Sequence, residues 1–336
     1  MAKNRRANAV MFGFDFQVNA AIVIMLENIY DFKSLRLEGN FEDIEIELNN
    51  HQYILAQAKA VEKSSSDFRN VRKNLKKALL SLSEGSQKVN VQQCIFITNS
   101  PNPLKEDAPG YFIFYGGSHR RFFELSEYSQ ELIKNYVNGI ACPLDLDKFM
   151  IQVLPFETDN DVERYKLVRR VVDDFIGDLN LNIPGLGKKL LDIWHEEVFK
   201  NGTKKDVAIQ LSKKDVIWPI MAIATDINYC DAEFSDMFDS SAYDEIVHHY
   251  KDTINYCCER YEFFIKVLYD YNTYCTSKSL SEKALDFVIY KWADYLTEYN
   301  LYGIDEEIQK GLIQIILYKI VCNRIKIQNI KKEVKL

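Results

Sequence analysis

The stretch F-E-D-I-E-I-E-L-N-N-H-Q-Y-I-L-A-Q-A-K-A, residues 41–60, decides the fold of the front half of this chain. Polar and apolar residues alternate in two of its segments, Phe41–Leu48 and Tyr53–Ala60, and such alternation is typical of strands. The dipeptide Asn49-Asn50 between them is a turn signal, so we expect a β-hairpin.

Segments on both sides of the hairpin mix helical and strand patterns, whereas helical patterns dominate after Phe156. The expected elements are helices over Asp15–Tyr30, about Asp67–Leu82, Gln130–Val137, Val162–Leu179 and Lys188–Phe199, and strands over Leu35–Glu38, Val91–Thr98, Tyr111–Tyr115 and Phe149–Leu154. The sequence therefore predicts an α/β domain, a mixed sheet flanked by helices, over residues 1–204, followed by an all-α domain over residues 205–336.

Three polar side chains of the hairpin fall on one face. Because side chains alternate along a strand, Asp43, Gln57 and Lys59 share a face, and small alanines between them suggest close helix packing on the reverse face. A carboxylate, an amide oxygen and an ammonium suit phosphodiester hydrolysis, because the oxygens hold a hard divalent cation and the lysine stabilises negative charge. The alternative is an ordinary solvated strand face, which often carries these residue types.

The other acidic residues of the hairpin are not expected to belong to the site. By the same alternation Glu42 falls on the face opposite Asp43, so we interpret it as structural. Glu45 and Glu47 lie on the Asp43 face and are expected to be solvated.

Four segments carry motifs in a recognisable order: Gly13–Gln17 (G-F-D-F-Q), Leu37–Ile46 (L-E-G-N-F-E-D-I-E-I), Ile54–Ala60 (I-L-A-Q-A-K-A) and Ile95–Asn99 (I-F-I-T-N). Together they resemble the double-stranded-DNA endonuclease domain of bacterial anti-phage effectors, a PD-(D/E)xK-type nuclease whose last motif reads Q-x-K. This domain occurs in the CD-NTase-associated effectors of CBASS and in the nuclease subunit of Lamassu systems, and the resemblance covers roughly the first 160 to 200 residues.

The resemblance implies a restriction-endonuclease-like fold and a site. Carried onto matching positions, it makes Asp43 and Gln57 metal ligands, Lys59 the catalytic lysine and Glu38 a further acidic site residue, with Mg²⁺ or another hard divalent cation as cofactor. Gln17, from the first helix, is expected to lie near this site.

The helix after the hairpin carries a basic stripe. Its members are spaced i, i+3, i+4, i+7 and i+8 on the side opposite Phe68, Val71, Leu75 and Leu79. They are Arg69, Arg72, Lys73, Lys76 and Lys77. Such a stripe beside a nuclease site would bind DNA phosphates without reading sequence, whereas the alternative is a solvated helix face.

A 3.5-residue apolar period marks the helical half. Its positions are Tyr243, Val247, Tyr250, Ile254, Cys257, Tyr261, Phe264, Leu268 and Tyr271. This seam predicts lengthwise helix packing, either as a hairpin within the chain or as a subunit interface.

The resemblance, together with a short helical tail, favours a Lamassu-like nuclease subunit. This implies a toxic effector of a defence complex, restrained by homo-oligomerisation or by partners, with an SMC-like ATPase and a small accessory subunit among them. The alternatives are a stand-alone Mrr-type restriction nuclease that selects modified DNA and a non-catalytic helical adaptor.

Composition agrees with this assignment. The net charge is −7, but the first 110 residues are nearly balanced, and the excess acid lies in the remainder. Seven cysteines without C-x-x-C spacing favour a reduced, cytoplasmic setting. The longest apolar stretches, Ala20–Leu26 and Leu312–Cys322, are too short to span a bilayer, so no membrane partner is expected.

Overall fold

The computed structural model describes residues 8–63, 67–105, 114, 118–157, 159–181, 183, 185–224, 246, 250, 260–298 and 304–336. The chain divides into two compact units, Met1–Val216 and Ile217–Leu336. The sequence placed the division between residues 204 and 205. The first unit extends further because Leu211–Ser212 joins its sheet.

The first unit alternates helices and strands. In chain order it contains α1 (Asn8–Glu27), β1 (Phe32–Leu37), β2 (Ile44–Leu48), β3 (Tyr53–Lys59), α2 (Phe68–Ser86), β4 (Val91–Thr98), β5 (His119–Arg121), α3 (Glu127–Val137), β6 (Phe149–Val153), α4 (Asp161–Arg164), α5 (Lys166–Asp178), α6 (Leu186–Thr203) and β7 (Leu211–Ser212). Two 3-10 turns, Phe122–Glu124 and Leu146–Lys148, precede α3 and β6 respectively. The strand predicted at Tyr111–Tyr115 lies, apart from Phe114, outside the described residues.

Within the described residues the strands form one seven-stranded mixed sheet in the order β5-β6-β4-β3-β2-β1-β7. The predicted hairpin is present, since β2 and β3 are antiparallel neighbours with Ile44 opposite Ala56. β3, β4 and β6 run parallel, and β4 is the buried strand predicted at Val91–Thr98. The chain therefore contains the expected mixed sheet flanked by helices.

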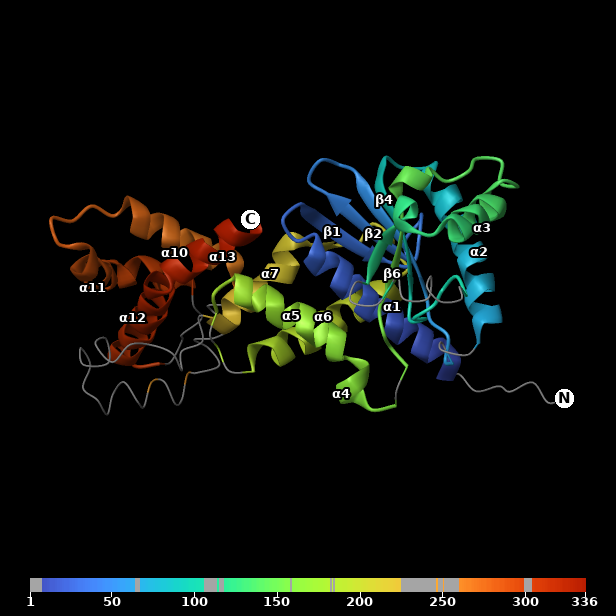
Figure 1. Cartoon of the computed structure of the whole chain (residues 1–336). Helices are drawn as coiled ribbons and strands as arrows, with labels where there is room; N and C mark the ends of the chain where they lie inside the picture. The colour runs from blue at the N-terminus through green and yellow to red at the C-terminus, as the bar shows by residue number, and fades with distance from the viewer. Residues whose placement is uncertain are drawn as a thin grey trace. The chain divides into compact units, whose positions relative to one another are not determined.

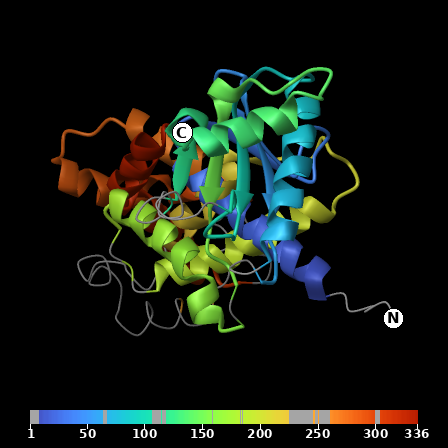
Figure 2. The same ribbon diagram turned by 45° about the vertical axis from the view of Figure 1, so that its right-hand side comes forward.

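Helices cover both faces of this sheet (Figures 1 and 2). On one face α2 and α3 pack on β3, β4 and β6, where Leu79 and Ile133 join Leu55, Phe96 and Ile151 in a buried cluster. On the other face lie α1, α5 and α6, and a Cβ on Gly202 of α6 would contact Leu37 of β1 and Phe14 of α1. This second face carries the alanines of β3, so the close helix packing expected there involves α1.

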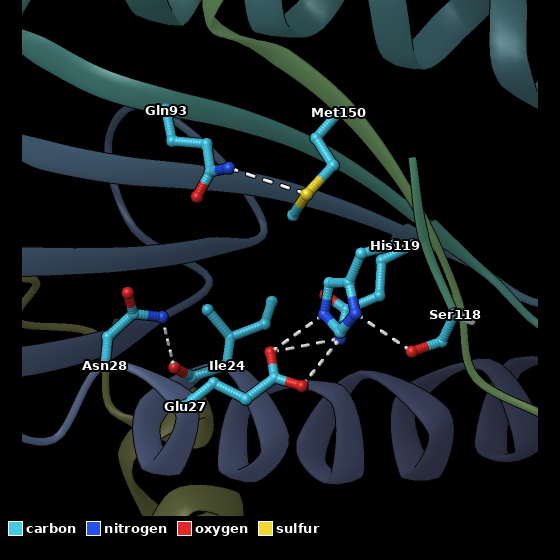
Figure 3. Close-up of polar contacts among 8 residues, drawn as sticks. Ile24, Glu27, Asn28, Gln93, Ser118, His119 and Met150 are labelled. Atoms are coloured by element: carbon cyan, nitrogen blue, oxygen red, sulfur yellow. Dashed lines mark hydrogen bonds and ion pairs between the residues drawn. The ribbon is translucent and has the colours of Figure 1, made fainter. Parts of the chain in front are cut away.

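The inner position of α1 explains its composition. Every residue from Phe16 to Leu26 is buried, because the sheet covers one side of the helix and α5 and α6 cover the other. By length and composition alone, α1 could cross a membrane, but 61% of its most apolar window is buried within the protein. At its end Glu27 points toward His119, with Oε2 3.1 Å from Nε2 (Figure 3). Glu27 also accepts from the Gln152 amide of β6. These bonds fix α1 to the far edge of the sheet.

The described part of the second unit is helical. It contains the end of α7 (Lys213–Ala224), then α10 (Tyr261–Thr273), α11 (Leu280–Lys291), the 3-10 segment Trp292–Glu298, α12 (Glu306–Cys322) and α13 (Arg324–Val334). α12 is its core, with every residue from Gly311 to Val321 buried.

The apolar seam is only partly placed. Tyr243, Val247, Ile254 and Cys257 lie outside the described residues. Phe264, Leu268 and Tyr271 are buried on α10. α10 begins after Arg260, whose φ and ψ of −78° and 97° are extended, so the seam does not follow one uninterrupted helix.

Candidate functional site

A tight loop between β1 and β2 builds the site. The expected strand Phe41–Leu48 begins only at Ile44, because residues 38–43 turn instead of extending. Glu38 has a φ of 53°, and its amide donates to the Asp43 carbonyl at 2.8 Å. A non-glycine residue in this left-handed region is uncommon and costs of order 1–3 kcal/mol, and such residues cluster at functional sites.

A buried carboxylate holds the loop in this shape. Glu45 is 5% exposed, and its Oε1 accepts from the backbone amides of Phe41 and Glu42. A Cβ on Gly39 would collide with the same carboxyl group, so a larger residue there would displace the Glu45 carboxyl. Burial raises the pKa of Glu45. The expectation that Glu45 is solvated is therefore wrong, because the loop folds over it.

α1 contributes Gln17 to the loop. This side chain is 6% exposed, and its amide donates to Glu38 Oε1 at 2.8 Å and to the Asp43 carbonyl at 3.1 Å. Gln17 thus joins the two acidic residues that the resemblance assigns to one site. The Glu38 side chain itself is exposed.

The three residues that share a strand face meet at the adjoining ends of β2 and β3. Lys59 Nζ donates to Asp43 Oδ2 at 2.8 Å, and the two side chains are 31% and 20% exposed. The last paired residues at this end of the hairpin are Ile44 and Ala56, and Asp43 and Gln57 are their immediate neighbours in the chain. Gln57 is 5% exposed, and its amide makes no hydrogen bond within the described part of the chain. Asp43, Gln57 and Lys59 therefore form one polar cluster.

Glu42 lies against α2, on the side of the sheet that carries this cluster. Its side chain is hydrogen-bonded to Ser81 of α2, and Oε2 accepts from the Asp43 amide at 3.3 Å. The prediction of the opposite face is wrong, because strict alternation applies only to extended residues and Glu42 belongs to the loop. It is 6% exposed, and burial, only partly offset by the Ser81 hydrogen bond, raises its pKa to about 7.

The donor set suits a small hard cation. Nowhere in the described ranges do three His, Cys, Asp or Glu side chains group closely enough to hold a metal by themselves. Mg²⁺ does not need such a cage, since it keeps several waters and binds one or two carboxylates together with substrate phosphates. The Asp43 carboxylate and the unpaired amide oxygen of Gln57 fit that mode.

The basic stripe of α2 divides into two parts. Arg69, Lys73, Lys76 and Lys77 are exposed, and none of them makes an ion pair with another described residue. We call Lys73, Lys76 and Lys77 the α2 lysines. Because the opposite side of α2 is buried against the sheet, the α2 lysines face solvent.

Arg72 differs from the rest of the stripe. It is half-buried, and its guanidinium donates to the Leu104 carbonyl at 2.6 and 3.1 Å and to the Tyr128 hydroxyl at 3.0 Å. These bonds attach the segment after β4 and the start of α3 to α2. Arg72 is thus committed to intramolecular bonds and is not available as a phosphate ligand in this conformation.

A cavity of about 700 Å³ lies beside the first half of α1, and its lining does not include Asp43, Gln57 or Lys59. Its lining includes Asp15, Glu62, Glu157 and Asp159 but only one arginine, Arg164, so it would repel a phosphate backbone. Asp15 accepts from the Tyr165 hydroxyl at 2.9 Å and lies 3.0 Å from His195 Nε2. These contacts join α1 to the helices behind it.

No protein-family model matches this chain, and no curated protein or solved structure matches it significantly.

Proposed function

We propose that this protein is a metal-dependent endonuclease that cleaves double-stranded DNA with little sequence preference. The observation that carries the proposal is the contact between Lys59 and Asp43, with Gln57 directly after Ala56, the last paired residue of β3 in the hairpin. The resemblance of the surrounding motifs to PD-(D/E)xK effector nucleases assigns the same three residues to catalysis.

Each side chain has a distinct part in this chemistry. Asp43 and Gln57 supply the oxygens that would hold Mg²⁺, and the bound cation would act as a Lewis acid on the phosphodiester. Lys59, held at the rim of the cluster by Asp43, places a positive charge where negative charge develops on the phosphate. Gln17 and Glu38 keep the loop, and with it Asp43, in position.

The α2 lysines suit a DNA partner. They are exposed on the helix that follows Lys59 in the chain, and lysine contacts to phosphates add affinity that does not depend on sequence. We infer that α2 lies along the DNA backbone while the hairpin reaches the scissile phosphate.

The biological setting rests on the resemblance alone. We propose a cytoplasmic, Lamassu-like effector of anti-phage defence whose helical unit binds a second copy or the SMC-like ATPase and accessory subunit. Activity would then depend on assembly. Size-exclusion chromatography beside a cleavage assay tests this, and a strictly monomeric, fully active enzyme would contradict it.

Cleavage of supercoiled plasmid tests the enzyme itself. The full-length protein should nick and linearise plasmid in Mg²⁺ and not in EDTA, and Asp43→Asn should abolish the reaction while retaining the wild-type circular dichroism spectrum. If the wild-type protein, assembled with its partners, leaves DNA intact in both Mg²⁺ and Mn²⁺, the non-catalytic adaptor is the better explanation.

A further inference from the structure

Glu42 is a buried carboxylate without a full set of partners. The side chain is 6% exposed, yet Oε1 has no hydrogen-bond partner among the described atoms. A buried polar atom left unpaired costs of order 1–3 kcal/mol, and more when it carries charge. Native structures retain few such atoms, and a bound ion is one way in which they are satisfied.

The surroundings of Glu42 contain more negative than positive charge. Asp43 follows directly, and both carboxylates interact electrostatically with Lys59, whose ammonium is already bound to Asp43 Oδ2. One ammonium does not balance two carboxylates, whereas a divalent cation in addition would. We therefore propose that Glu42 is a second carboxylate ligand of the divalent cation, beside Asp43 and the Gln57 amide.

Geometry favours Glu42 over its acidic neighbours for this role. Glu45 Oε1 is occupied by the amides of Phe41 and Glu42, so its carboxylate already has a structural task. Glu38 is exposed, and its Oε1 accepts from Gln17. Glu42 Oε2 accepts from the Asp43 amide at 3.3 Å, whereas Oε1 has no partner among the described atoms and can take a ligand.

Two carboxylates and one amide oxygen match the sparse ligand set of Mg²⁺, whose remaining positions are filled by water and substrate phosphate. This role for Glu42 rests on the proposed nuclease function but concerns metal affinity, so the two can fail separately.

Calorimetric titration with Mn²⁺, in the absence of DNA, tests the proposal on the full-length protein. Glu42→Gln keeps the size and hydrogen-bonding ability of the side chain but removes the charge, and we expect it to weaken Mn²⁺ binding at least tenfold. Glu47→Gln is the matched control: Glu47 is on the same hairpin but is paired with Lys33 and His51, so Mn²⁺ affinity should remain within twofold of wild type.

The outcomes separate the two ideas. If Asp43→Asn weakens Mn²⁺ binding and Glu42→Gln does not, the role of Glu42 is wrong and the nuclease proposal stands. If the wild-type protein binds no Mn²⁺, both fail. Should Glu42→Gln not fold, Glu42→Asp replaces it, because a shortened carboxylate should weaken binding while keeping charge; unchanged affinity in that variant also refutes the role.

Discussion

Replacement of Lys59 by methionine separates catalysis from stability. The substitution keeps the length of the side chain and removes the ammonium that binds Asp43 at 2.8 Å. At that distance two unit charges attract by about 1.5 kcal/mol in water. Both side chains are partly exposed, and ordering them opposes the attraction, so the net loss of stability should be about 0–1 kcal/mol.

The effect on cleavage should be far larger. Removing one group that stabilises developing negative charge costs about 10²–10³ in rate, which corresponds to about 2.7–4 kcal/mol of transition-state stabilisation. Lys59→Met should therefore unfold in urea almost as wild type does, yet nick plasmid at least about a hundredfold more slowly in Mg²⁺.

Lys33 offers a matched control. It pairs with Glu47 at 2.6 Å, also across the sheet, and 44% of its side chain is exposed. Lys33→Met should lower stability by a similarly small amount and leave cleavage unchanged. The assignment of Lys59 is refuted if Lys59→Met retains a rate within threefold of wild type, or if both lysine variants lose the same fraction of activity.

Three further outcomes follow from the structure. Changing all three α2 lysines to glutamate should weaken DNA binding and reduce the slope of log affinity against log salt by at least about 2; an unchanged slope removes α2 from the interface. Arg36→Met should lower the free energy of unfolding, measured in urea, by about 3 kcal/mol or more. Arg36 is 2% exposed, and its guanidinium donates to three backbone carbonyls at and after the end of α6. A loss below about 1 kcal/mol would contradict this. Burial raises the pKa of Cys94 to about 12, so at pH 8 iodoacetamide should modify exposed Cys142 and Cys275 in the native protein and Cys94 only after unfolding, as read by peptide mass spectrometry.

The sequence predicted the regular helices and strands because the hydrophobic pattern of each fits only one type of secondary structure. Val91–Thr98 has the predicted bounds of β4, since a continuous apolar run next to a turn matches a fully buried parallel strand. Alternation likewise placed Gln57 and Lys59 of β3 on the face that carries Asp43, and the 2.8 Å contact between Lys59 Nζ and Asp43 Oδ2 agrees with this. The predictions hold where the backbone is extended.

The same reasoning failed where the backbone turns. Glu42 was misplaced because residues 38–43 form a loop with a left-handed Glu38, and strand alternation does not extend into such a turn. Glu45 lies in β2, and it is buried instead of solvated because the loop folds over it. Arg36 went unnoticed because its acceptors are backbone carbonyls more than 160 residues away in the chain, and carbonyls have no signature in the sequence. Long-range contacts of this kind follow only from the packed structure.

The misplaced residues explain how the site is held. A left-handed residue and the buried Glu42 carboxyl in one short loop are each unfavourable, and they persist because Gln17, Ser81 and the Glu45 carboxyl of β2 fix the loop from three directions. α1 supplies the first contact and α2 the second, so the hairpin end is held between the two helical layers. In the proposed nuclease, Asp43 and Glu42 would thereby be in position before a cation or DNA binds. Such preorganisation is what electrostatic catalysis requires, because reorientation of the charged groups would otherwise add to the barrier.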